Sequence, residues 1–234
     1  MGHSIMILKM KNKNFYNNKL TAKRYFNIIK NYKKPFSKTF ILRNFGLFIG
    51  DKSLFKILKC FELIEQIKNI KGDVVEFGVW NGNNLVTMKK IFDYFKIKKN
   101  IIGYDNFKGM PTPDNKNYFI GEIDLINYIK KFFRLENIKI IKDDIMNLEK
   151  HYKDFPKLSM IYIDCDLYKT TSKILETLSN KLNKKGLIVF DEANFNINKG
   201  EGKAAREFYK KNKKKFDKII LKKYYQPDLI LRKK

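Results

Sequence analysis

From Gly72 onward, short apolar runs alternate along the chain with segments in which apolar residues recur every three or four positions. Short runs rich in Ile and Val are typical of buried strands, whereas the wider spacing is typical of helices. The pattern predicts strands over residues 74–77, 101–104, 138–141, 160–163, 187–190, 218–221 and 229–231. It predicts helices over residues 53–70, 84–95, 125–133, 170–182 and 203–214.

This alternation predicts an α/β fold in which a mostly parallel, seven-stranded sheet is covered by helices on both faces. The last two strands lie close together in the sequence, and we expect them to form an antiparallel pair at one edge. The helix before the first strand has Ser53 as its expected N-cap. Its apolar stripe consists of Leu54, Leu58, Phe61, Ile64 and Ile67.

Residues 1–50 are basic and aromatic and show little periodicity, apart from a short helix expected over residues 20–32. We therefore divide the chain into an N-terminal extension, residues 1–50, and one α/β domain, residues 51–234. We expect the extension to pack on the domain or to form contacts with a second subunit in a homo-oligomer.

The formal net charge is +26, from 50 basic and 24 acidic residues. Such a surplus is compatible with a nucleic-acid partner, with a phosphate-bearing small substrate, or with a lysine-rich solvated surface. Only five of the basic residues are arginines. Proteins that recognise nucleic-acid phosphates and bases specifically tend to use arginine. We therefore expect no specific nucleic-acid binding, although an RNA-binding function stays open as an alternative.

Other features of the composition indicate where the protein works. Two cysteines, Cys60 and Cys165, do not make a disulfide framework and suit a reducing compartment. No apolar run reaches the roughly 18 residues of a membrane span, and the start of the chain has no signal-peptide core. We expect a cytoplasmic protein without a membrane span.

An acidic residue lies at or just beyond the carboxyl end of each of the first five predicted strands. These positions are Glu76 at the end of the first strand, where the first loop begins, Asp105, Asp143 with Asp144, Asp164 with Asp166, and Asp191 with Glu192. In parallel sheets, ligands bind beyond the carboxyl ends of the strands, so these acids should share one rim. A single acid after a strand is often only a helix cap, but five such positions in a basic chain indicate a binding site.

The first loop contains Glu76, Gly78 and Gly82 but matches neither the dinucleotide nor the P-loop phosphate motif. Gly78 permits a tight turn and a close approach of backbone to a ligand, or merely a tight connection between strand and helix. A glutamate in this loop suits a cofactor that carries a cationic amine. Asp105 can accept hydrogen bonds from ribose hydroxyls, and Asp143 from an adenine amino group.

Four blocks of the sequence resemble the macrocin and mycinamicin sugar O-methyltransferase family. They are residues 72–82 (GDVVEFGVWNG), 105–111 (DNFKGMP), 164–171 (DCDLYKTT) and the acidic pair Asp191-Glu192. Their order and spacing cover roughly residues 51–215. The resemblance implies a Rossmann-like class I methyltransferase fold that uses S-adenosyl-L-methionine.

By matching position, Glu76 and Gly78 line the methionine end of the cofactor and Asp105 holds its ribose. The full set of expected cofactor contacts is Glu76, Phe77, Gly78, Gly82, Asn83, Asp105, Asn106, Asp143, Asp144 and Asp164. Asn83 departs from the family pattern, which more often has a small residue at this position.

The resemblance also implies a divalent cation, Mg²⁺ or Mn²⁺, held by Asp164, Asp191 and Glu192. Asp164 and Asp191 end neighbouring strands, and three converging carboxylates would repel one another unless protonated or neutralised. An all-oxygen set suits these cations rather than Zn²⁺. The alternative is that Asp191 caps the next turn and Glu192 faces solvent. Glu192 stands where the family more often has Asp or Asn.

Asp191 or Asp166 is the expected catalytic base, because His3 and His151 do not follow predicted strands. Tyr168 either contacts the substrate or packs at a helix start, and Cys165 is expected to be a packed thiol.

These residues predict O-methylation of a sugar hydroxyl, with a nucleotide-linked sugar or another glycoconjugate as acceptor. The alternatives are an RNA-binding protein or RNA methyltransferase that uses the basic surface, and a structural module that has lost its chemistry.

Overall fold

The computed structural model describes residues 37–47, 49, 51–110, 118–194, 199–220 and 226–234. The chain divides after Leu54 into two compact units. The described part of the first unit contains helix α2 (Lys38–Arg43) and the short 3-10 helix η2 (Phe45–Leu47). Ser37 caps α2, because its Oγ accepts a hydrogen bond from the Phe40 N–H at 3.0 Å. The helix expected over residues 20–32 lies outside the described residues.

The second unit, residues 55–234, is built around a seven-stranded sheet. The strands are β1 (Asp73–Phe77), β2 (Ile101–Asp105), β3 (Ile138–Lys142), β4 (Leu158–Ile163), β5 (Leu182–Phe190), β6 (Phe216–Ile219) and β7 (Leu229–Lys233). Their order across the sheet is β3-β2-β1-β4-β5-β7-β6. The first five strands pair in parallel, while β7 runs antiparallel to both β5 and β6. This confirms the mostly parallel sheet and the antiparallel pair at its edge.

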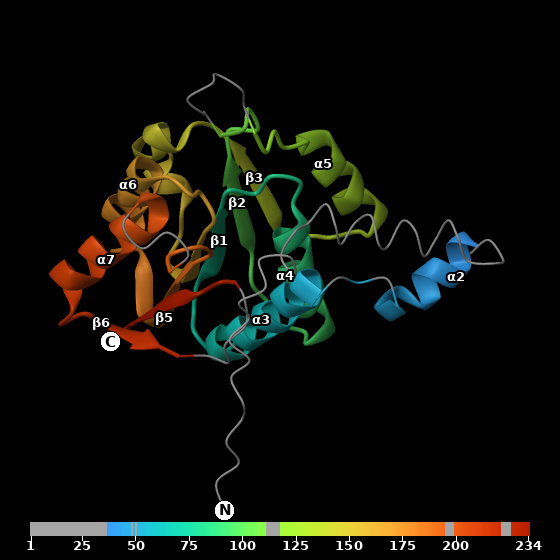
Figure 1. The fold of residues 1–234 in the computed structure, drawn as a ribbon, viewed down its shortest axis with the longest axis horizontal. Helices are drawn as coiled ribbons and strands as arrows, with labels where there is room; N and C mark the ends of the chain where they lie inside the picture. Colours follow the sequence, from blue (N-terminus) through green and yellow to red (C-terminus); the bar gives the residue numbers. More distant parts are fainter. Residues whose placement is uncertain (1–36, 48, 50, 111–117, 195–198, 221–225) are drawn as a thin grey trace, which may run out of the picture. The chain divides into compact units, whose positions relative to one another are not determined.

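Helices lie on both sides of this sheet (Figure 1). The helices of the second unit are α3 (Asp51–Ile67, beginning in the first unit), α4 (Asn83–Tyr94), α5 (Ile123–Phe132), α6 (Tyr168–Leu178) and α7 (Gly200–Asn212), with the 3-10 segment η3 (Ile145–Asp154). One core cluster joins the sheet to α3, α4 and α5, and the other joins it to η3, α6 and α7. Side chains alternate along each strand, so Val75 and Phe77 belong to one cluster and Val74 to the other.

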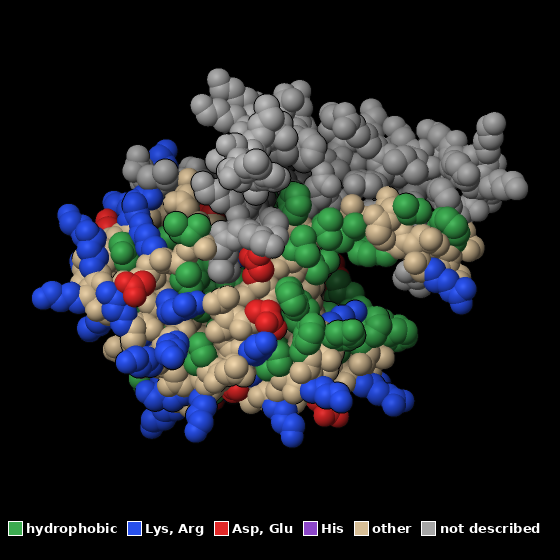
Figure 2. Space-filling view, turned by 90° about the horizontal axis from the view of Figure 1, so that it is seen from below, with side chains coloured by type: hydrophobic (Ala, Val, Ile, Leu, Met, Phe, Trp, Pro, Cys, Tyr) green, Lys and Arg blue, Asp and Glu red, His purple; other side chains and the backbone are tan. Residues whose placement is uncertain are grey.

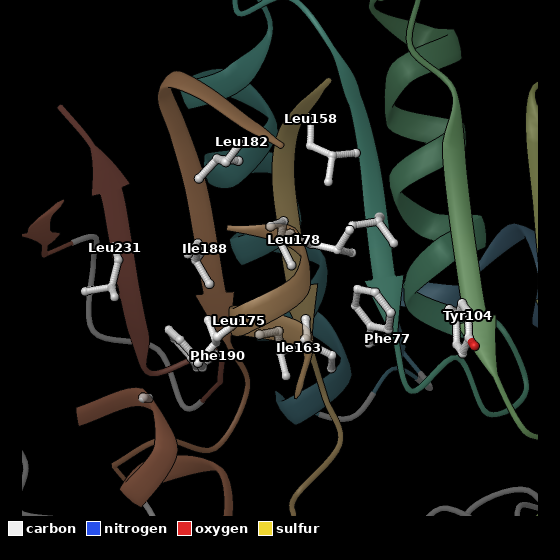
Figure 3. Packing of buried hydrophobic residues seen from close by; sticks show 14 of the residues in the cluster. Phe77, Tyr104, Leu158, Ile163, Leu175, Leu178, Leu182, Ile188, Phe190 and Leu231 are labelled. Carbon is white, nitrogen blue, oxygen red and sulfur yellow. The ribbon is translucent and has the colours of Figure 1, made fainter. Parts of the chain in front are cut away.

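Figure 3 shows the cluster on the α6 side, where Leu175 and Leu178 pack against the strands. Phe77, Ile163 and Phe190 come from the ends of β1, β4 and β5 and are fully buried. Burial of these large side chains directly below the carboxyl ends of three strands holds the rim of the sheet in place, because close-packed interiors resist displacement.

The helix boundaries differ from the sequence pattern at several points. Ser53 lies inside α3, which begins at Asp51, so the prediction that it caps this helix is wrong. Helix α6 ends at Leu178, and Leu182 instead begins β5, because its apolar side chain serves the sheet core equally well. The 3-10 segment η3 was not predicted; only one of its residues, Leu148, is buried.

Candidate functional site

The five parallel strands end on one rim, and the chain beyond β1, β4 and β5 stays in register. The Asp164 N–H donates to the Phe77 carbonyl at 2.9 Å, and the Asp191 N–H donates to the Ile163 carbonyl at 3.0 Å. These bonds continue the sheet ladder one residue past each strand. Asp164 and Asp191 therefore lie side by side, as expected for neighbouring strands.

Glu76 is a buried carboxyl group at the end of β1, only 1% exposed. Its Oε1 accepts a hydrogen bond from the Asn84 amide at 3.1 Å, whereas its Oε2 is buried without a hydrogen-bond partner among the described residues. Asn84 is itself oriented by the Cys60 thiol, which donates to its Oδ1 at 2.8 Å. Burial raises the pKa of Glu76 to about 8, against the opposing effect of the Asn84 hydrogen bond. An unpartnered buried acceptor of this kind is ready for a cationic donor.

Gly78 makes the turn after β1, with φ at +84°. A Cβ atom at this position would lie 1.9 Å from the Asp164 carbonyl oxygen. The tight approach of two strand ends therefore requires this glycine. Gly82, at φ +77°, immediately precedes α4, and Asn83 is the exposed first residue of that helix. The Phe77 side chain is buried in the core cluster on the α6 side of the sheet.

Asp105 ends β2 and organises the two loops beside it. Its Oδ2 accepts the Trp80 N–H at 2.9 Å, and its Oδ1 accepts the Phe107 N–H at 2.7 Å. Trp80 is 47% exposed and meets Phe119 edge to face, with ring centroids 5.9 Å apart. The Asn106 side chain closes its own turn by accepting the Lys108 N–H at 2.7 Å. An exposed aromatic pair thus lies next to the carboxylate that we expect to hold a ribose.

Asp143 and Asp144, after β3, are engaged by the loop that they fold. Asp144 caps η3 by accepting the Met146 N–H at 2.9 Å. Asp143 accepts hydrogen bonds from the Asn147 amide and from His151 Nε2, each at 2.9 Å. These bonds hold the pKa of Asp143 at about 2, and the same contact raises the pKa of His151. The sequence did not reveal this role of His151, because a 3-10 segment brings it back beside the strand end.

Lys56 of α3 lies between the two acids that end β4 and β5. Its Nζ is 3.4 Å from Asp164 Oδ2 and 3.3 Å from Asp191 Oδ2. Asp191 is 2% exposed, and its Oδ1 accepts a hydrogen bond from the Tyr162 hydroxyl at 2.5 Å. Burial alone would lower the pKa of Lys56, but Asp164 and Asp191 together raise it well above its usual range. Burial, together with Asp191, raises the pKa of Asp164, against the effect of Lys56.

Asp166 and Glu192 belong to a second layer of acids at the same two strand ends. Glu192 Oε1 accepts a hydrogen bond from the Gln226 amide. Asp166 is half-buried, and its pKa is raised by burial and by Asp191, against a hydrogen bond shared with Glu192. The Asp166 carbonyl accepts the Glu201 N–H at 3.0 Å.

Glu201, in the first turn of α7, connects the loops after β4 and β5. Its carboxylate accepts the Glu192 N–H at 3.0 Å and the Cys165 N–H at 3.3 Å. It is 2% exposed, which is uncommon for a glutamate. We therefore infer a structural role for Glu201 in holding the two loops of the site together. A sequence signal existed, since an acid just after Gly200 in a basic stretch is unusual, but the predicted helix began later, at residue 203.

Two further expectations concern side chains near the rim. The Tyr168 hydroxyl donates to Glu207 Oε2 at 2.6 Å, and Tyr168 begins α6, where it is 37% exposed. Cys165 packs against the core, in agreement with a packed thiol, and burial raises its pKa well above the usual value.

The expected metal ligands do not form a cation site in this arrangement. Among the described residues, no three His, Cys, Asp or Glu side chains are placed to hold a metal ion. Asp164 and Asp191 converge, but on the Lys56 ammonium, while Glu192 is turned to Gln226. The donor set therefore does not fit a divalent cation. The sequence missed Lys56 because α3 precedes the sheet and its polar face carries no motif.

The fold and the rim of acids define the class of protein. The order β3-β2-β1-β4-β5-β7-β6, with β7 antiparallel, is the sheet of class I methyltransferases. In agreement, the structure of the calicheamicin methyltransferase CalS11 superposes with a TM-score of 0.72 at 18% identity, covering 92% of this chain and 91% of that one.

The family follows from the sequence. Residues 43–221 match the family described as Macrocin-O-methyltransferase (TylF), and the chain belongs to this family. This confirms the resemblance carried by the four sequence blocks.

Two curated relatives are each 25% identical to the chain. One is the 8-demethyl-8-(2,3-dimethoxy-alpha-L-rhamnosyl)-tetracenomycin-C 4'-O-methyltransferase of Streptomyces olivaceus, aligned over 162 residues. The other is the demethyldecarbamoylnovobiocin O-methyltransferase of Streptomyces niveus, aligned over 163 residues. Each alignment covers 62% of this chain and 61% of the relative, so the chain spans about three fifths of the length of these relatives.

Proposed function

We propose that this protein transfers the methyl group of S-adenosyl-L-methionine to a hydroxyl group of a sugar. The observation that carries the proposal is the Glu76 carboxyl at the end of β1, with a buried oxygen that has no partner within the described structure. A cofactor with a cationic amine supplies the missing donor. Membership of the family supports the same reaction, and the names of both curated relatives describe O-methyltransferases.

The residues present fit this cofactor. Glu76 would receive its amine, and Asp105, which ends the neighbouring strand, would accept hydrogen bonds from its ribose. Each carboxylate oxygen of Asp105 has two lone pairs, so the backbone N–H groups of Trp80 and Phe107 leave acceptor capacity for the ribose. The bound cofactor would supply a methyl group already activated by a sulfonium. What remains for the chain is to orient the acceptor hydroxyl and to remove its proton.

Asp166 is the better of the two proposed bases. Asp191 is buried, and both of its oxygens are engaged, one by Tyr162 and the other by Lys56. Asp166, in the loop after β4, is less buried than Asp191, so an acceptor hydroxyl can reach it. We assign Asp166 as the base that takes the hydroxyl proton and Asp191 as a fixed charge behind it.

The acceptor that we propose is a sugar in a glycoconjugate or linked to a nucleotide. The name of one relative describes a 4'-O-methyltransferase of a tetracenomycin that carries a dimethoxy-rhamnosyl unit. The lysine surplus of this chain favours an acceptor that carries phosphate. Tyr168, at the start of α6, would border the acceptor. Because Asp164 and Asp191, two of the three residues expected to bind Mg²⁺, contact Lys56 instead, no step of this proposal passes through a metal.

Calorimetry with S-adenosyl-L-methionine and S-adenosylhomocysteine tests the cofactor. We expect binding at micromolar strength, and weakening by ~1–3 kcal/mol in Asp105→Asn, which replaces one acceptor oxygen with a donor. Asp217→Asn is the matched control. Asp217 is an exposed acid on β6, the strand at the edge of the sheet, and it forms an ion pair with Lys234. A folded protein that gives no binding heat with either compound would refute the proposal. Transfer of labelled methyl to a panel of nucleotide sugars and glycosides then identifies the acceptor class.

No described helix is long and apolar enough to cross a membrane. A cytoplasmic location stays a prediction, based on the two free cysteines.

A further inference from the structure

Lys56 stands where the family resemblance places a divalent cation. Its ammonium is within 3.4 Å of a carboxylate oxygen of both Asp164 and Asp191. These are two of the three expected ligands, and the third, Glu192, is hydrogen-bonded to Gln226. Two neighbouring carboxylates, one of them almost fully buried, need a counter-charge, and here the chain itself supplies it.

The ammonium keeps capacity for one more contact. A lysine ammonium has three N–H donors, and the two acids account for two of them. The Lys56 side chain is 30% exposed, so the remaining donor has access to the rim of the sheet. Asp166, the proposed base, belongs to the same loop as Asp164.

We propose that Lys56 is a catalytic residue that replaces the metal ion in this chain. It neutralises Asp164 and Asp191 and donates a hydrogen bond to the acceptor oxygen, whose negative charge grows as the proton leaves. A fixed positive charge at this position stabilises the transition state in the manner of an oxyanion hole. The inference rests on the proposed methyl transfer.

The reaction balances without a further reagent. The O–H bond of the acceptor breaks and its proton passes to the Asp166 carboxylate. The oxygen forms a bond to the methyl carbon while the carbon–sulfur bond breaks, and that electron pair stays on sulfur. The products are the methyl ether, a neutral thioether and protonated Asp166. Lys56 remains protonated throughout.

The first test measures metal binding and does not depend on activity. We expect the full-length wild-type protein to leave the electron paramagnetic resonance signal of millimolar Mn²⁺ unchanged. In Lys56→Met, the two acids lose their counter-charge, and we expect Mn²⁺ affinity to rise at least tenfold. The double variant Lys56→Met/Asp191→Asn should lose that gain. Lys68→Met is the control, because Lys68 pairs with Glu65 just beyond the end of α3.

The second test measures methyl transfer. We expect the wild type to keep its rate of methyl transfer in excess chelator. In Lys56→Met, kcat should fall at least a hundredfold while cofactor affinity is retained. Lys56→Arg should recover part of that loss in kcat. The inference would be overturned if the wild type binds Mn²⁺ tightly and Asp191→Asn abolishes that binding. This outcome does not depend on whether Lys56→Met folds. The inference would also be overturned by a wild-type rate that a chelator removes and Mg²⁺ restores. Absence of cofactor binding would instead refute the proposed function, whatever the Mn²⁺ result.

Discussion

Glu76 is a carboxyl group in a buried position that disfavours its charged form. A carboxyl group with an ordinary pKa near 4.5 is held at 1% exposure, where its pKa is about 8. Within the part of the chain that the structure describes, only Asn84 donates a hydrogen bond to one of its oxygens. Such uncompensated groups concentrate at functional sites, because the ligand supplies the missing interaction.

We predict that Glu76→Gln stabilises the cofactor-free protein at pH 8. The folded-state pKa lies above the unfolded value, so the folded protein binds the extra proton between pH 4.5 and about 8. Stability is therefore lost as pH rises through this window and is constant above it. Glutamine removes this loss, which amounts to a few kcal/mol at roughly 1.4 kcal/mol per pKa unit. Urea denaturation at several pH values measures the difference.

The same variant should bind S-adenosyl-L-methionine roughly tenfold or more weakly, since a charge-assisted hydrogen bond is lost. Glu65→Gln is the control, because Glu65 is part of a more exposed pair with Lys68. If Glu76→Gln and Glu65→Gln change the free energy of unfolding equally at pH 8, burial of Glu76 is not the cause of the change in stability.

At the scale of elements, the site depends on how closely β1 and β4 approach at their carboxyl ends. The Asp164 N–H bonds to the Phe77 carbonyl, and the turn that follows β1 passes directly over the Asp164 carbonyl. Glu201 of α7 then joins the loops after β4 and β5 through two backbone N–H groups. Contacts among β1, β4 and α7 thus hold the acids in position.

We predict that Gly78→Ala destabilises the protein by more than about 2 kcal/mol. Alanine at φ +84° is strained, and its Cβ would lie 1.9 Å from the Asp164 carbonyl oxygen, so the strand ends must separate. Gly46→Ala is the matched control, because a Cβ at Gly46 meets nothing within 4 Å. Thermal unfolding of both variants is the measurement. Equal melting temperatures would show that the turn after β1 is not under steric constraint.

At the scale of the whole molecule, the dominant feature is the charge of +26. Figure 2 shows lysine and arginine side chains spread over much of one face of the protein, with other side chains between them. Exposed lysines of this kind attract polyanions without selecting among them.

We predict that any RNA binding is independent of sequence and disappears between roughly 50 and 200 mM salt, because it arises from counterion release alone. Fluorescence anisotropy with two unrelated RNA sequences of equal length measures it. A preference for one sequence that persists at the higher salt concentration would contradict this prediction and revive the RNA methyltransferase alternative.

The order of strands and helices in the α/β domain followed from the sequence by itself. Short apolar runs such as 160–163 and 187–190, rich in β-branched residues, favour buried strands, and the spacing of apolar residues in α4 favours a helix with one buried face. The acids at the strand ends were likewise predictable, because alternation of strand and helix brings all carboxyl ends to one rim. The family blocks, with their glycines and paired acids, pointed to the same class of enzyme.

Only the tertiary structure decided what those acids contact. Lys56 contacts Asp191 although more than a hundred residues separate them in the sequence, and Tyr162 contacts it from 29 residues away. Neither Lys56 nor Tyr162 lies in a motif. Glu201 and His151 likewise act through contacts that depend on how α7 and η3 fold back on the rim. Sequence patterns report burial and local spacing, whereas the partner of a charged side chain depends on the packing of elements that are distant in sequence. A rim of carboxylates was therefore foreseeable, but its neutralisation by a lysine was not.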